Sequence, residues 1–227
     1  MKANYTARPF GVLLLIGSVA AAFAPAGALA QQRAAGAGWY GGLSVGGSQI
    51  SMSDNILPVA PVAATTTSLH KDDSSTGFKL FGGYRYNQNF ALEGGYTDLG
   101  KFDARRDVTA PVVGSISRNM RMAGFDLAAV GIIPVQNGFS LFGKIGAMYT
   151  MTRSSISISG ALLPAPTLTD LNPRRSEWNP KFGLGAGYDF SNGMGLRLEY
   201  ERVSNVGDAA TGEGNVGMWS LGLTKRF

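Results

Sequence analysis

The chain of 227 residues has no cysteine, one histidine and few charges, with Asp, Glu, Lys and Arg making up 15% of the sequence. Without cysteine it can form neither a disulfide framework nor a thiolate metal site. Its charged fraction is well below the ~25% that is usual for soluble domains. A formal net charge of +5 is also too small to predict binding to nucleic acid. The composition therefore argues against a disulfide-stapled secreted domain and against a nucleic-acid-binding protein.

The first thirty residues have the three parts of a secretory signal peptide. Lys2 and Arg8 supply the positive charge, residues 10–24 are apolar, and Ala28-Leu29-Ala30 provides the small residues of a cleavage site. The alternative is a membrane anchor, but the apolar run is shorter than the ~20 residues that a spanning helix needs. We predict export and cleavage after Ala30, with residues 1–30 as signal peptide, 31–37 as a short linker and 38–227 as one barrel domain.

The predicted mature chain has no apolar run of the ~18 residues that would indicate a membrane helix. It keeps all but two of the 20 basic residues and all 15 acidic ones, which leaves a net charge of +3. Glycine is abundant, with 32 residues in the whole chain. A chain of this kind can cross a membrane only as a closed barrel, because lipid cannot satisfy the open edge of a sheet.

Alternation of apolar and small or polar residues with a period of two recurs along the chain, which is typical of barrel strands. In the first segment, for example, Trp39, Leu43 and Val45 share one face, while Tyr40 and Ser44 share the other. The segments that follow this pattern are 39–47, 77–86, 90–97, 117–133, 139–149, 181–190, 194–203 and 216–227. They predict eight antiparallel strands.

The polar face of these segments is mostly Gly, Ser and Ala, whereas the polar face of a soluble sandwich carries many charges. Small residues suit the interior of a narrow barrel in lipid. The connections alternate between tight turns near Asn87, Gln136 and Asn192 and long loops at about 49–76, 103–116, 151–180 and 204–215. We therefore predict an all-β, eight-stranded transmembrane up-and-down barrel with short periplasmic turns and long extracellular loops.

Several short pieces, in order, resemble the transmembrane domain of the OmpA family of outer-membrane barrels. They are Trp39-Tyr40-Gly41-Gly42-Leu43, residues 81–84 and 92–100, Arg197-Leu198-Glu199-Tyr200, residues 205–208 and residues 217–222. Many members of that family carry a peptidoglycan-binding domain after the barrel, and this chain is expected to lack it. The resemblance also implies that the last strand, ending at Phe227, carries the signal read by the barrel-assembly machinery. Lys225 stands where the family usually has an aromatic or apolar residue, and its long stem can snorkel to the interface.

Charged residues on the polar face are expected to converge in the lumen. They are Lys79, Arg85, Glu93, Asp126, Lys144, Arg197 and Glu199. Because buried charges must pair or cost several kcal/mol each, we expect a salt-bridge network that fills the barrel. The resemblance implies a gate at Glu93 and Arg197, but the matching alternative partners, Val130 and Gly187, carry no charge. We prefer a static network to a regulated pore.

The residues give less support to an enzyme or a carrier. His70 precedes Asp72, Asp73, Ser74 and Ser75, but adjacent residues of one loop seldom form a catalytic triad. No metal-ligand cluster, phosphate-binding loop or nucleotide fingerprint is present, so neither enzymatic activity nor a cofactor is predicted. Apolar segments at 56–62 and 161–166 allow a carrier of small hydrophobic molecules, and exposed loops allow adhesion or recognition.

The sequence thus predicts a monomeric structural barrel of the outer membrane with surface-exposed loops. Weak ion conductance through a mostly plugged lumen is a hypothesis. The expected partners are outer-membrane lipid, lipopolysaccharide and the barrel-assembly machinery. A hydrophobic carrier and an adhesion protein remain the alternatives, and an enzyme is the least favoured.

Overall fold

The computed structural model describes residues 37–52, 66–110, 113–160, 170–207 and 214–227. The predicted signal peptide, and the linker except for its last residue, lie outside these ranges. Among the described residues no helix is long and apolar enough to cross a membrane. The strands are β1 (Gly38–Met52), β2 (Thr66–Asp72), β3 (Ser74–Arg85), β4 (Phe90–Ala110), β5 (Gly114–Pro134), β6 (Phe139–Gly160), β7 (Arg174–Asp189), β8 (Met194–Val206) and β9 (Gly214–Arg226).

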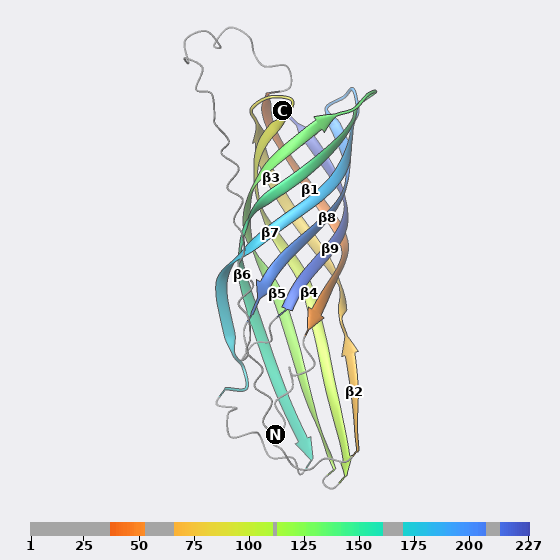
Figure 1. Ribbon diagram of the computed structural model, residues 1–227, viewed down its shortest axis with the longest axis vertical. Coiled ribbons are helices and arrows are strands. Elements are labelled where there is room, and N and C mark those ends of the chain that lie inside the picture. Colours follow the sequence, from red (N-terminus) through yellow and green to blue (C-terminus); the bar gives the residue numbers. More distant parts are fainter. Residues whose placement is uncertain (1–36, 53–65, 111–112, 161–169, 208–213) are drawn as a thin grey trace, which may run out of the picture. The chain divides into compact units, whose positions relative to one another are not determined.

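These strands form one antiparallel sheet that closes on itself (Figure 1). In the ring, β1 pairs with β3, each strand from β3 to β8 pairs with the next one, and β1 pairs with β9 to close the barrel. The short strand β2 pairs with β4 beyond the end of the β3–β4 ladder. In the sequence, a single residue separates β2 from β3. The described residues therefore contain eight ring strands, and the predicted eight-stranded antiparallel barrel is confirmed.

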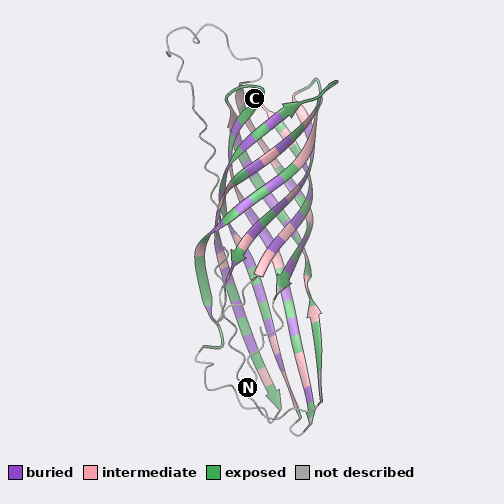
Figure 2. Ribbon diagram, viewed as in Figure 1, coloured by how far each residue is buried: buried purple, intermediate pink, exposed green. Residues whose placement is uncertain are grey.

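Inward and outward side chains alternate along every ring strand, and Figure 2 shows this as alternating colours. Leu43 and Val45 on β1 are 59% and 57% exposed, whereas the intervening Ser44 is 4% exposed. The predicted faces are therefore correct, with apolar residues outside and small or polar residues inside. This reversal of the usual burial pattern is stable only where lipid surrounds the wall.

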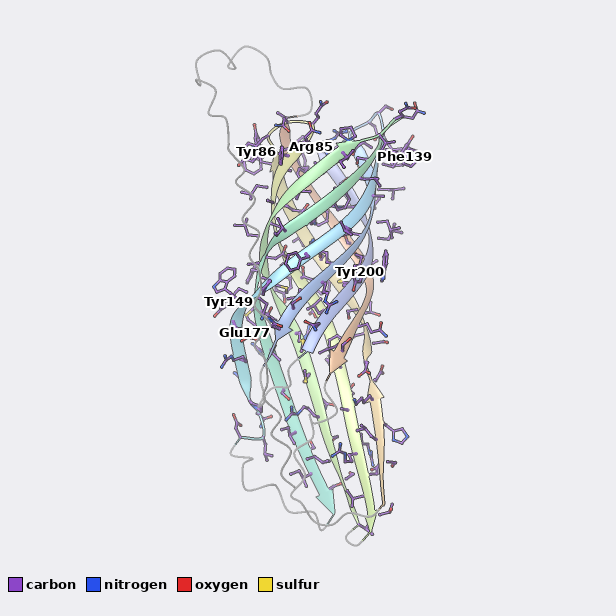
Figure 3. All side chains as sticks on the ribbon, viewed as in Figure 1. Arg85, Tyr86, Phe139, Tyr149, Glu177 and Tyr200 are labelled. Carbon is purple, nitrogen blue, oxygen red and sulfur yellow. The ribbon has the colours of Figure 1, made fainter. Side chains whose placement is uncertain are left out.

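Aromatic residues mark two levels on the outer wall. Trp39 and Tyr84 touch at one end with ring centroids 5.1 Å apart, and Tyr149 and Trp178 touch 5.3 Å apart further along the wall. Figure 3 shows Tyr86 and Phe139 near the turns and Tyr149 and Tyr200 partway along the barrel. Ten residues separate Phe139 from Tyr149, which corresponds to about 33 Å of strand. Because barrel strands are tilted by 35–45°, this length spans about 25 Å along the membrane normal. That height matches the apolar band of an outer-membrane barrel.

The three tight turns lie where the sequence predicts them. The Asn87 side chain accepts hydrogen bonds from the backbone N–H of Asn89 and of Phe90, both at 2.8 Å. Asn137 and Gly138 have φ values of 55° and 84°, and Gly193 has a φ of 77°, a left-handed conformation that suits Asn and Gly. These residues let the chain reverse between neighbouring strands with very few connecting residues.

The predicted long loops are shorter than expected, and the loop at 103–116 is wrong. β4 and β5 pair there as far as Val108 opposite Gly114. β6 continues to Gly160, so β2, β4, β5 and β6 extend beyond the other strands, at the bottom of Figure 1. Outside the membrane the outward face becomes polar, as at Lys101 and Asp103, while Phe102 and Ala104 point inward and are buried. The outward apolar residues that mark the strands within the membrane are missing there, so this segment looked like a loop in the sequence.

The barrel interior has three layers along its axis. Nearest the turns, Ala91, Val130, Ile132 and Phe142 form an apolar cluster. A charged layer follows, and beyond it lies a second apolar cluster contributed by β1, β4, β5, β6, β8 and β9. That outer cluster comprises Ile50, Leu99, Phe102, Met120, Met122, Met148, Val203, Val206, Val216 and Met218.

Candidate functional site

The charged layer is the most unusual part of the interior. The structure places six of the seven predicted charges within it, namely Lys79, Glu93, Asp126, Lys144, Arg197 and Glu199, each at most 7% exposed. They come from β3, β4, β5, β6 and β8, whose inward positions at this level lie opposite one another across the narrow lumen. The seventh, Arg85, lies at the mouth beside the turns.

Glu93 is the hub of the layer. Its carboxylate is 2.7 Å from a guanidinium nitrogen of Arg197 and 3.4 Å from Nζ of Lys79, and it also contacts Nζ of Lys144. The hydroxyl of Tyr40 donates a further hydrogen bond at 3.1 Å. One carboxylate thus joins side chains from four other strands, which ties together opposite sides of the barrel.

Glu199 extends the contacts of the same cations. It lies 2.6 Å from Nζ of Lys144 and 3.0 Å from Nε of Arg197. The guanidinium of Arg197 also lies over the Phe142 ring, 4.1 Å from its centroid, and 5.0 Å from the centroid of Phe81. Aromatic faces attract cations in this geometry, so the arginine is held by rings as well as carboxylates.

The sequence analysis missed two members of the layer, Lys181 and Glu201. Glu201 lies 2.6 Å from Nζ of Lys79 and 3.0 Å from Nζ of Lys181, and Lys181 is 3.1 Å from Asp126. Strand parity could have found both, because Lys181 shares its face with Gly183 and Glu201 shares its face with Glu199. They lie one step beyond the predicted cluster, toward the outer apolar layer.

With these additions the layer is electrically balanced. Among the residues that the structure describes, it contains four cations and four carboxylates, linked by contacts of 3.6 Å or less. These are Lys79, Lys144, Lys181 and Arg197 with Glu93, Asp126, Glu199 and Glu201. Such a network compensates buried charges within itself, so it needs no bound ion.

The mouth at the turn side holds a second, more exposed charge group. Asp189 lies 3.9 Å from Arg85 and 3.2 Å from Arg226. Between this group and Arg197 lies a cavity of about 50 Å³. Ligand pockets are typically about 300–1,000 Å³, so this cavity can hold water but no substrate.

A model of the OmpA-like transmembrane domain family matches residues 34–227. The chain belongs to this family. Outer membrane protein A of Yersinia pseudotuberculosis is 27% identical over 191 residues, which cover 83% of this chain and 48% of that protein. The chain thus spans about half the length of the curated relatives it matches. Like the proteins of this family, it is an outer-membrane β-barrel.

Solved structures of small outer-membrane barrels are also similar to this chain. The attachment invasion locus protein Ail of Yersinia pestis, solved with the heparin analogue sucrose octasulfate, is 17% identical with a TM-score of 0.45. Its match covers 84% of this chain and 99% of Ail. Neisserial surface protein A is 16% identical with a TM-score of 0.47, covering 83% of this chain and 97% of that one.

In the OmpA-like gate, the charged pair would exchange partners with two further charged residues. The matching positions in this chain, Val130 and Gly187, carry no charge. Val130 is buried in the apolar cluster at the turn side, and Gly187 lines the small cavity. Glu93 nevertheless has other cations within reach, because Lys79 and Lys144 contact it at the same time as Arg197. An exchange of cations at Glu93 would therefore change the lumen little, because Glu93 already contacts all three cations at once.

The remaining predicted positions of this OmpA-like barrel have these locations. His70 is exposed on β2 opposite Arg105, and the structure gives it no hydrogen bond to the neighbouring Asp or Ser side chains. Among the described residues no group of three or more potential metal ligands gathers. Segments 56–62 and 161–166 lie outside the described residues. The backbone N–H of Phe227 donates to the carbonyl of Trp39, and its role in assembly stays a prediction.

Proposed function

We propose that this protein is a structural outer-membrane barrel with a closed lumen, and that its contacts at the cell surface are made by the projecting strands and their connections. The observation that carries the proposal is the packing of the interior. A balanced charge layer lies between two apolar layers, and the outer apolar layer contains Met122, Met148, Val206 and Val216, all with no detectable exposure. Apolar constrictions block ions by excluding water.

The two kinds of layer have different consequences for conductance. If charges alone closed the lumen, removing Arg197 would open a path beside Glu93. The outer apolar layer does not involve Arg197 and stays in place in that variant. We therefore assign the barrier to both layers in series, and we infer that the charge layer stabilises the barrel instead of gating it.

The test is single-channel recording in planar bilayers with the native chain and Arg197→Ala. We expect neither protein to produce discrete openings, since the apolar layer is intact in both. Retention of the folded, heat-modifiable form on a gel serves as the control for insertion. Openings in the native protein would contradict a closed lumen, and openings only in Arg197→Ala would make the charge layer the sole barrier.

We also propose that the barrel has no catalytic activity and no cofactor, acts as a monomer and does not bind nucleic acid. Two observations support the first point: among the described residues the exposed His70 has no hydrogen bond or ion pair to a carboxylate, and the turn-side cavity is small. Cleavage after Ala30 and recognition of the last strand by the barrel-assembly machinery remain part of this proposal.

A further inference from the structure

Four basic residues form a row across the outer wall of the barrel. The strand register sets Lys101 opposite Arg121, Arg121 opposite Arg153, and Arg153 opposite Arg174. All four are exposed and point away from the lumen. Neighbouring strands are about 4.8 Å apart, so the row spans roughly 14 Å across β4, β5, β6 and β7.

The row carries an excess of positive charge. Like charges placed directly opposite one another on a sheet are destabilising unless another group compensates them. Arg121 pairs with Asp98 at 2.7 Å. Lys101, Arg153 and Arg174 have no ion pair within the part of the chain that the structure describes. Three of the four cations in the row are therefore left to interact with something outside the protein.

The height of the row indicates what that partner is. The same four strands carry a row of aromatic residues in direct register, Tyr96, Phe125, Tyr149 and Trp178. Such aromatics lie at the membrane interface. On β5, β6 and β7 the basic row lies four residues further out than the aromatic row. Four residues are about 13 Å of strand, which at the usual tilt is about 10 Å along the membrane normal. That height is the headgroup region of the outer leaflet.

The surroundings of the row suit a phosphate-bearing ligand. All four cations line one hollow, together with the side chains of Asn119, Ser155 and Asn172, which can donate hydrogen bonds, and one carboxylate, Asp103. A guanidinium binds phosphate through two parallel hydrogen bonds. The hollow on the far side of the ring, between β1, β3, β8 and β9, contains one cation, Arg202, among Gly, Ser, Gln, Asn and aromatic residues.

We propose that the basic row binds the headgroup of an outer-leaflet lipid that carries more than one phosphate, the class to which lipopolysaccharide belongs. The length of the row allows two phosphates of one headgroup to be bound at once, and its height above the aromatic row places a lipid headgroup in reach while the acyl chains lie along the wall. This inference rests on the outer-membrane location and does not depend on whether the lumen is closed.

The experiment uses the full mature chain refolded in detergent micelles and titrated with lipid A that bears two phosphates. Native mass spectrometry measures the fraction of protein with lipid bound. Arg153→Gln/Arg174→Gln is compared with the matched control Arg105→Gln/Arg202→Gln, which removes two exposed arginines elsewhere on the outer wall. We expect roughly 25-fold weaker binding for the first pair, at about fivefold per arginine, and little change for the second.

Three further arms decide between ligand sources. Phosphatidylcholine in place of lipid A should not bind, and millimolar inorganic phosphate should not displace lipid A. Arg153→Lys/Arg174→Lys should keep most of the affinity, because lysine still binds phosphate as a point charge. It also serves as the informative variant if the glutamine pair does not fold. Equal weakening in both arginine pairs, binding of phosphatidylcholine or displacement by free phosphate would each overturn the proposal.

Discussion

At the residue scale the stability of this barrel depends on compensation among buried charges. The Glu93 carboxylate meets Arg197, Lys144 and Lys79, and each of these cations also touches another carboxylate of the layer. Removing one partner of such a buried group leaves charge uncompensated, whereas removing a cation and a carboxylate together keeps the balance. The energetic role of Glu93 is therefore measurable by single and paired substitutions.

Glu93→Gln is expected to lower the free energy of unfolding by about 3–5 kcal/mol, because four buried cations would then face three carboxylates. Urea-induced unfolding in lipid vesicles, followed by tryptophan fluorescence, measures the change. Glu93→Gln/Lys144→Met should recover most of the loss. Arg105→Gln, which breaks the exposed Arg105–Asp107 pair, should cost at most about 1 kcal/mol. A Glu93→Gln variant as stable as the native chain would mean that water screens the layer.

The membership of the charge layer could be predicted from the sequence only in part. Strand parity identifies which charged residues point inward. It correctly predicted six members of the layer, and the same rule applied further along the strands would have found Lys181 and Glu201. Parity cannot say which cation meets which carboxylate. The contact between Glu93 on β4 and Arg197 on β8 crosses the lumen, so it depends on strand tilt and barrel diameter, which the local sequence pattern does not contain.

At the element scale the glycines of the strands have two distinct roles. On β6, Gly146 points inward, and a Cβ there would lie 2.1 Å from the Leu127 carbonyl oxygen and 2.6 Å from Cα of Ala128. Gly143 on the same strand points outward, and a Cβ there would come no closer than 3.7 Å to Leu184. Close backbone approach therefore requires glycine at the first position only.

Gly146→Ala is expected to destabilise the barrel by about 1–3 kcal/mol, since backbone atoms must move apart to admit the methyl group. Gly143→Ala should be neutral or slightly stabilising, because it restricts the unfolded chain without a clash. The urea midpoint of each variant in the same vesicles gives the comparison. Equal destabilisation by the two substitutions would show that strand propensity, and not close approach, accounts for the effect.

The strand ends show why the elements were predicted better inside the membrane than outside it. Within the lipid band, alternation is enforced at every position, and the predicted faces and turns are correct. Beyond the outer aromatic row, β4 and β5 still pair from Gly100 to Val108, with Phe102 buried inside and Lys101 exposed outside. The alternation therefore continues there with the opposite polarity to that in the lipid band, so a search for outward apolar residues does not find it.

At the scale of the whole molecule the same chain has three surroundings: periplasm, lipid and the cell exterior. The closed ring and the two aromatic levels about 25 Å apart place the outward Leu184, 70% exposed, within the lipid band. From the short turns and the projecting strands we predict that the turn containing Gln136 faces the periplasm and that Ser157 on β6 faces the cell exterior.

Because the native chain contains no cysteine, a single introduced thiol reports its own location. We expect Ser157→Cys to react with a membrane-impermeant maleimide on intact cells, and Gln136→Cys to react only after the outer membrane is permeabilised. Leu184→Cys should resist the reagent in both cases, because lipid excludes the charged probe. Labelling of Gln136→Cys on intact cells with protection of Ser157→Cys would reverse the orientation, and the basic row would then face the inner leaflet. Reaction of Leu184→Cys would mean that this part of the wall contacts water, which the apolar outer face of β7 does not permit in a lipid-embedded barrel.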